Sequence, residues 1–272
     1  MQHSTTSTIE EISKLLDSSK IPLLEGRGSF LLHLADNALI LAQRNSEWCG
    51  HGPVLEQDIA LTNISLDLLG QARNFYQYAA QLKGAGATED SLVYLRNERA
   101  FKNCLLVEQP NGDWGQTILR QFLFSNYQHL LYEQLKISND ETLAAIATKA
   151  LKEVTYHVRW SSEWVIRLGD GTEESHERML KALDELWPFT GELFVPAEYE
   201  SETMVSFNLS SLQQPWHEKV MAVLKEASLW TPNFGEQVFM QTGGKEGVHS
   251  EHLGYILAEL QYLQRAYPGA EW

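Results

Sequence analysis

Residues 54–83 read VLEQDIALTNISLDLLGQARNFYQYAAQLK. Apolar residues recur along this stretch at the spacing of one helix face. They are Leu55, Ile59, Leu61, Ile64, Leu68, Ala72 and Phe75. Such a period of 3.6 residues predicts one long amphipathic helix. Pro53 precedes it, where proline suits a first helical turn, and a glycine at position 84 follows it.

The rest of the chain continues the helical pattern between short turns. We predict further helices over residues 30–48, 89–102, 114–136, 141–168, 173–187, 215–228 and 251–266. Asp113, Asp140 and Thr172 stand where a side chain caps a helix N-terminus. For residues 194–215 the sequence predicts an irregular segment that could include a short strand. Four long helices with a cross-connection predict an all-α, ferritin-like helical bundle with additional flanking helices.

Length and charge limit the number of domains and the kinds of partner that this protein can have. The 272 residues fit a single helical domain over residues 28–272, after an arm over residues 1–27 that we expect to be loosely attached. A formal charge of −15 repels phosphate backbones, so we expect no nucleic-acid partner. No apolar run is long enough to span a membrane. With no secretory signal at the N-terminus either, we expect a cytoplasmic protein whose two cysteines, Cys49 and Cys104, are buried thiols.

A bundle of this kind can hold two irons, so the acidic residues were compared with that ligand pattern. A ferritin-like di-iron centre takes a carboxylate from each of two helices and a Glu-x-x-His from each of two others. Asp36 and Asp67 lie 31 residues apart on neighbouring predicted helices, as a first half-site requires. Gly70 and Tyr156, however, occupy the two positions where histidines should follow Asp67 and Glu153. The spacing therefore predicts degenerate ligand positions, with no metal, cofactor or catalytic residue in this chain.

The acidic residues also have a structural interpretation. Asp36, Asp67 and Glu153 are interpreted as buried or half-buried acids that pair with nearby bases, because buried charges persist when paired. The candidate bases are Arg44, Arg73, Lys152 and Arg159. Two more Glu-x-x-His matches, Glu173–His176 and Glu246–His249, fall in a first helical turn and in a glycine-rich loop, where capping and packing explain them better. The same holds for His252.

Several segments together resemble one family. The segments are EWCGHGP (47–53), LTNISLDLLGQARNF (61–75), LLVEQPNG (105–112), KEVTYHVR (152–159), TGGKEGVHSEHLG (242–254) and AELQYLQR (258–265). In order and spacing they resemble the C-subunit family of the bacterial 1,2-phenylacetyl-CoA epoxidase, a ring-oxygenating complex. The resemblance covers about residues 28–272 and leaves the role of residues 1–27 open.

The resemblance implies a function and a set of partners. It implies a ferritin-like, non-catalytic structural subunit that has lost its iron ligands and supports a homologous catalytic A subunit. That A subunit would hold the di-iron centre and the CoA thioester, in a complex that takes electrons from a separate reductase and serves aerobic phenylacetate breakdown. Self-association stays open. The alternative is an enzyme, a di-iron carboxylate oxygenase or oxidase with an atypical ligand set.

One loop suggests a contact with a partner. Thr242 to His249 places two glycines, Lys245 and another glycine before the last predicted helix, where exposed backbone N–H groups attract anions. Lys245 is therefore a candidate contact to a partner carboxylate or, less favoured, to a CoA phosphate. The competing interpretation is a plain glycine turn that lets two helices pack closely, with Lys245 in solvent.

Overall fold

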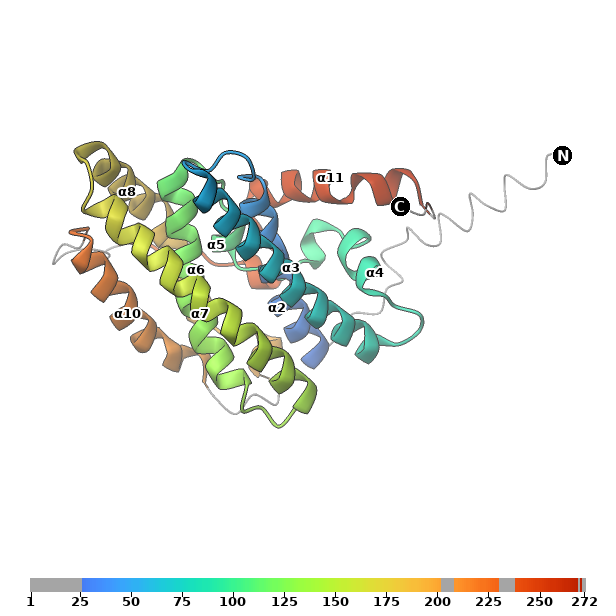
Figure 1. The fold of residues 1–272 in the computed structure, drawn as a ribbon. Helices are drawn as coiled ribbons and strands as arrows, with labels where there is room; N and C mark the ends of the chain where they lie inside the picture. The colour runs from blue at the N-terminus through green and yellow to red at the C-terminus, as the bar shows by residue number, and fades with distance from the viewer. Residues whose placement is uncertain (1–25, 202–207, 230–237, 269, 271–272) are drawn as a thin grey trace.

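The fold is a bundle of four long helices with shorter helices around it (Figure 1). This computed structural model describes residues 26–201, 208–229, 238–268 and 270. The bundle helices are α2 (Arg27–Ser46), α3 (Leu55–Lys83), α6 (Trp114–Leu135) and α7 (Glu141–Gly169). α2 pairs with α3 and α6 with α7, each pair antiparallel, and α3 also packs against α7. Within the described residues there is no strand, which confirms the predicted all-α class.

The remaining helices cover the bundle from outside. The cross-connection from α3 to α6 runs through α4 (Glu89–Tyr94), η2 (Glu98–Ala100) and α5 (Leu105–Glu108). After α7 come α8 (Glu173–Leu186), η3 (Trp187–Phe189), η4 (Gly191–Phe194), α9 (Glu198–Ser201), η5 (Leu209–Leu212), α10 (Gln213–Glu226), η6 (Gly244–Glu246) and α11 (Glu251–Ala266). α8 and α10 pack against α6 and α7, whereas α11 packs against α4 and η2. These are the additional flanking helices that the sequence predicts.

Helix starts follow the predicted caps, while two predicted segments need correction. Asp113, Asp140 and Thr172 each accept a hydrogen bond from a backbone N–H of the turn they cap. The helix predicted over residues 89–102 breaks into α4 and η2, with an extended residue, Asn97, between them. The region 194–215 contains short helical turns and no strand among its described residues. The predicted arm lies outside the described residues up to residue 25.

α2 is the central helix of the protein. Every residue from 28 to 42 is buried, including Asp36 and Asn37, because α3, α5 and α9 all pack against it. The pattern in the sequence predicts only one apolar face for this helix. A helix that is enclosed on all sides must satisfy its polar side chains inside the protein, and that requirement shapes the interior of the bundle.

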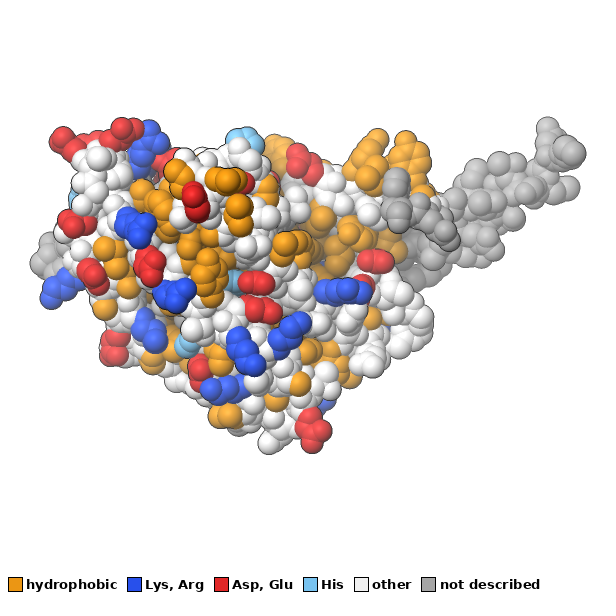
Figure 2. Space-filling model, in the orientation of Figure 1, with side chains coloured by type: hydrophobic (Ala, Val, Ile, Leu, Met, Phe, Trp, Pro, Cys, Tyr) orange, Lys and Arg blue, Asp and Glu red, His pale blue; other side chains and the backbone are white. Residues whose placement is uncertain are grey.

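α3 has two apolar faces, whereas the spacing of apolar residues in the sequence predicts a single one. Leu61, Ile64 and Leu68 are buried against the bundle as predicted. Leu55 and Ile59, which the periodicity places on the same side, are 70% and 50% exposed. On the face seen in Figure 2, hydrophobic side chains gather over the region of α3 and α7. The inner stripe of α3 forms the core, and the outer stripe stays on the surface.

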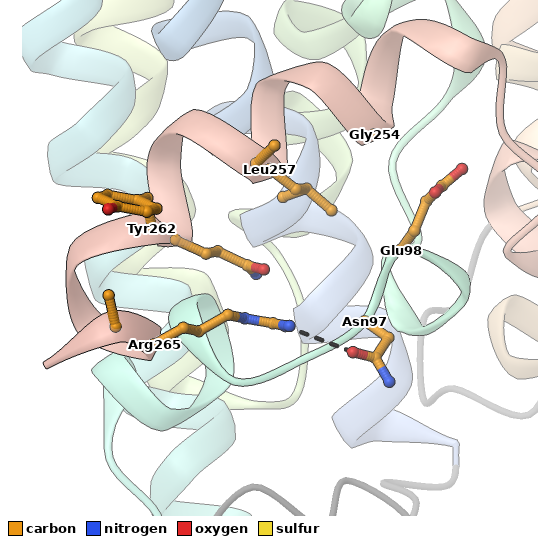
Figure 3. A pocket seen from close by; sticks show the side chains of 9 residues that line it. Asn97, Glu98, Gly254, Leu257, Tyr262 and Arg265 are labelled. Carbon is orange, nitrogen blue, oxygen red and sulfur yellow. Dashed lines mark hydrogen bonds between the residues drawn. The ribbon is translucent and has the colours of Figure 1, made fainter. Parts of the chain in front are cut away.

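α11 lies outside the four long helices, with Leu253, Ile256 and Leu257 buried in the core, and polar contacts also hold it. Arg265 donates to the carbonyl oxygen of Arg96 at 2.8 Å and reaches the Asn97 side chain at 3.4 Å (Figure 3). Gln261 donates to the carbonyls of Val93 and Arg96. A surface hollow of about 520 Å³ lies beside these contacts, between α11 and the turn at Asn97.

Two predictions about the chain as a whole can be compared with the fold. Neither cysteine forms a disulfide, but only Cys104 is buried and Cys49 is exposed, so the expectation of two buried thiols is wrong for Cys49. Cys49 lies in the turn between α2 and α3, where no helix covers it. In the part of the chain that the structure describes, no helix has the length and apolar character to span a membrane.

Candidate functional site in the bundle interior

Asp36 is the centre of a buried ion pair. Its side chain is fully buried on α2, and its carboxylate binds the Arg96 guanidinium, with Nη1 donating to Oδ2 at 3.0 Å. The Tyr76 hydroxyl of α3 donates to Oδ1, and the backbone N–H of Lys102 donates to Oδ2 at 2.8 Å. The carboxylate therefore has a full set of donors from the protein itself, as a buried charge requires.

Asp67 lies in a different environment. It is on α3 with 36% of its side chain exposed, and its Oδ2 lies 3.1 Å from Nε2 of the buried His157 on α7. One turn further along, Gln71 Nε2 donates to Glu153 Oε2 at 2.9 Å. Burial raises the pKa of Glu153, the bond from Gln71 opposes this, and the negative charge of Asp67 adds to the rise. Both hydrogen-bonded pairs join α3 to α7.

The two aspartates do not form a half-site. Asp36 contacts Tyr76, which lies nine residues after Asp67 on α3, or about 13 Å along the helix axis. Because α2 and α3 are antiparallel, nine residues back along α3 correspond to about nine residues onward along α2, so we infer that Asn45 and not Asp36 lies near the level of Asp67. A spacing of 31 residues is compatible with adjacent helices but does not fix which residues meet, since the length of the turn between them sets the register.

Amide side chains occupy the bundle interior at this level. Asn45 Nδ2 donates to Gln121 Oε1 of α6 at 2.7 Å, and Gln121 Nε2 donates to the Ser125 hydroxyl at 2.7 Å. One layer away, Gln128 of α6 donates to Gln71 Oε1 at 3.0 Å. An amide carries both a donor and an acceptor, so such groups can bond one another. The buried Arg120 guanidinium also donates to Asn45 Oδ1 at 3.5 Å, and Gln128 Oε1 has no hydrogen-bond partner among the described residues. Carboxylates at the same places would repel each other unless a metal joined them.

Gly70 and Tyr156 both face away from this interior. Both residues are exposed, and a side chain added at Gly70 would meet nothing within 4 Å. The inward positions come one residue later on each helix, at Gln71 and His157. The two positions where the motif needs histidine, Gly70 and Tyr156, therefore face outward. A histidine at either position would point to the surface. Sequence reasoning missed Gln71 and Gln121, although a glutamine amid apolar helix residues is a usable signal.

The bases predicted as partners are not the ones found. Asp36 pairs with Arg96, Asp67 with His157 and Glu153 with Gln71. Of the predicted bases, Arg44 bonds Glu47 and the carbonyl of Glu108, and Arg73 bonds Glu89. Lys152 and Arg159 are exposed on α7. The prediction used proximity in the sequence, whereas Arg96 reaches Asp36 from the cross-connection, 60 residues away.

Lys245 is an internal anchor. It is only 3% exposed, and its Nζ donates to the Glu200 carboxylate and to the carbonyl of Val195, each at 3.0 Å. Neither a contact to another molecule nor a solvated lysine fits this burial, so both sequence interpretations of Lys245 are corrected. The turn itself does bring segments close together: a Cβ at Gly247, where φ is +81°, would meet the Arg99 carbonyl oxygen at 2.2 Å.

The other Glu-x-x-His matches have structural roles. His249 lies between the buried Glu108 carboxylate, 2.9 Å from Nδ1, and the Phe101 carbonyl, 3.0 Å from Nε2. Burial lowers the pKa of His249. The hydrogen bond and the negative charge of Glu108 raise the pKa by more than burial lowers it, so the net shift is upward. His176 binds the carbonyl of Gly169 at the end of α7. Glu246 and Glu173 are exposed and point elsewhere.

The residues present do not fit a di-iron centre. Among the described residues no group of three or more His, Cys, Asp and Glu side chains is arranged to hold a metal ion. Asp67, Glu153 and His157 are neighbours, but α2 and α6 offer amides where the pattern needs carboxylates. No chemical step through iron is therefore derived for this chain.

Comparison with known proteins agrees with this bundle and its segments. The family model described as "Phenylacetic acid catabolic protein" matches residues 18–272. The chain belongs to this family. The chain is also 50% identical, over 247 residues, to the C subunit of 1,2-phenylacetyl-CoA epoxidase from Escherichia coli strain K12. That alignment covers 90% of this chain and 98% of the E. coli protein.

The matches confirm the resemblance seen in the sequence segments, and they extend over the whole described bundle. Residues 1–17 lie outside the family model. Both findings show the family to which the chain belongs. The E. coli relative is named as one subunit of an enzyme.

Proposed function

We propose that this chain is the non-catalytic structural subunit of a phenylacetyl-CoA 1,2-epoxidase complex, which acts in aerobic phenylacetate breakdown. In this proposal it supports a homologous A subunit that holds the di-iron centre and the CoA ester, and a reductase supplies the electrons. The relative in E. coli is the C subunit of that enzyme, and half of the aligned residues are identical.

The amide network of the bundle interior is the observation that carries the proposal. In a catalytic ferritin-like subunit the interior is completed by metal ions, so its side chains are carboxylates and imidazoles. Here Asn45 with Gln121 and Gln71 with Gln128 hydrogen-bond directly to one another. A bundle that is complete without a metal retains the outer shape of the fold and can serve as a rigid support.

The alternative, an oxygenase or oxidase with atypical ligands, would have to use Asp67, Glu153 and His157. These two carboxylates and one imidazole are not arranged to hold a metal ion together, and both carboxylates already have hydrogen-bond partners. Reduction of O₂ at a di-iron centre needs more ligands than these three supply. This alternative therefore has no observation in its favour.

Iron analysis and reconstitution test the proposal together. The purified chain, incubated anaerobically with ferrous iron and desalted, should retain far less than one iron per chain, and should not oxygenate phenylacetyl-CoA. The A subunit with its reductase should gain activity when this chain is added. A stoichiometric di-iron load on this chain alone would contradict the proposal, as would full activity of the A subunit without it.

A further inference from the structure

The outer face of α3 has the residue spacing of a helix–helix seam. Positions 55, 59, 62, 66, 69 and 73 alternate steps of four and three, which is the spacing of the a and d positions of a coiled coil. Leu55, Ile59, Leu66 and Leu69 are 70%, 50%, 60% and 38% exposed. Thr62 and Arg73 occupy the other two positions, so the apolar part from Leu55 to Leu69 runs for about 21 Å at 1.5 Å per residue, which is more than a single scattered surface leucine. A seam of this kind fits one partner helix.

The backbone along this stripe allows close approach. Gly70 lies beside Leu66 and Leu69 on the outer face, and the space in front of it is open. Glycine in the interior of an exposed helix lowers its stability, so its presence here has no local benefit. On a docking face, however, it removes the side chain that would hold two helices apart.

The neighbouring face of α7 carries positive charge. Lys149, Lys152 and Arg159 are exposed on α7, as is the acidic Glu163, and Figure 2 shows basic side chains with some acidic ones among them in this region. This contrasts with the formal charge of −15 for the whole chain. A partner helix that packs on α3 and presents acidic side chains toward α7 would complement both features.

The same charges argue against a second copy of this chain as the occupant. A symmetric dimer brings identical patches together, so the basic residues of α7 would lie near their own counterparts. The net charge of two strongly acidic chains adds repulsion. A different subunit would not bring these identical basic residues together.

We propose that the outer face of α3, bordered by the basic residues of α7, is the surface on which an amphipathic helix of the catalytic subunit docks. That helix contributes apolar side chains to Leu55, Ile59, Leu66 and Leu69, and acidic side chains toward Lys152 and Arg159. This inference rests on the proposed function, because the partner is the A subunit of the epoxidase.

The test is the affinity of the full chain for the purified A subunit, measured by calorimetry, with light scattering for composition. Leu66→Arg should weaken binding by at least about 30-fold, as expected for a central interface residue. Ile137→Arg is the matched control, because Ile137 is 67% exposed at the turn between α6 and α7; it should bind as the unmodified chain does. Lys152→Glu should weaken binding by about 10-fold at low salt and less at high salt.

Each result decides between distinct explanations. If the unmodified chain binds the A subunit and Leu66→Arg binds equally well, the docking surface is wrong while the proposed function stands. If the unmodified chain does not bind at all, the proposed function fails as well. A dimer of the chain alone that Leu66→Arg dissociates would identify a second copy as the occupant and overturn the proposal. A Leu66→Arg chain that melts several degrees lower would show that the stripe packs within the protein, which also overturns it.

Discussion

Asp36 and Asp67 lie on two antiparallel helices that pack against each other, yet their surroundings differ in almost every respect. Asp36 is fully buried and bound to a guanidinium, a phenol and a backbone N–H. Asp67 is half-exposed, and it pairs with the imidazole of His157. The difference arises from the helices that carry them: α2 is enclosed by neighbours, whereas α3 has one face on the surface.

The comparison shows how an acid can remain in a metal-free bundle. On the α2 side the charge stays and is balanced by Arg96, which comes from the cross-connection. On the α3–α7 side the buried interior carries the amides of Gln71, Gln128 and Gln121, while the acids Asp67 and Glu153 lie partly exposed and bond His157 and Gln71. Removing one member of a buried ion pair is expected to be far more damaging than removing a half-exposed acid.

Asp36→Ala should have the largest effect. It leaves the Arg96 guanidinium buried without its carboxylate, which is expected to lower the free energy of unfolding by about 3–5 kcal/mol. For a chain of this size the midpoint of thermal unfolding should fall by roughly 10 °C. The double variant Asp36→Ala/Arg96→Met should recover part of the loss. A single variant as stable as the unmodified chain would mean that Arg96 has water around it.

The pH dependence of stability should come next, through His33, one turn before Asp36 on α2. Burial lowers the pKa of His33 to about 4, against an ordinary value of 6.5. The unfolded chain then binds the proton more readily, so stability falls as pH drops from 6.5 toward 4. This residue alone should remove roughly 3 kcal/mol over that range. Urea unfolding at pH values of about 7 and about 4.5 measures this loss of stability, because most of it occurs between the two values.

His33→Gln provides the control for that pH series. The variant cannot take up the proton, so its stability should change less between the two pH values than that of the unmodified chain. Equal pH slopes for the two proteins would exclude His33 as the source.

Asp67→Ala tests the other side of the comparison. The loss of one hydrogen bond to His157, at a position that water can reach, should lower the free energy of unfolding by about 1 kcal/mol. This is well below the loss expected at a fully buried pair. Chemical denaturation of the Asp67→Ala and Asp36→Ala chains side by side measures the ratio. Similar losses at both sites would contradict this difference between the two helices.

Gly70→Ala should give the smallest change, and in the opposite direction. The position is helical and exposed, and an added methyl group meets no neighbour. Alanine should therefore stabilise the isolated chain by about 0.5–1 kcal/mol. A loss of stability would indicate that the outer face of α3 is covered within the protein.

Local patterns in the sequence account for most of the helices. The periodicity of residues 54–83, the caps at Asp113, Asp140 and Thr172, and the family segments were enough to predict an all-α bundle. The missing Glu-x-x-His pairs were also visible, because i, i+3 spacing depends only on residues one turn apart.

Only the tertiary structure decided which residues meet. Arg96 reaches Asp36 across 60 residues of chain, Lys245 is buried against Glu200, and α3 turns Leu55 and Ile59 outward. The register between helices and the neighbours that enclose them set these contacts, and both depend on turns and packing far away in the sequence. A hydrophobic period determines that a helix forms and has an apolar side, whereas the surrounding helices determine how many of its sides are buried.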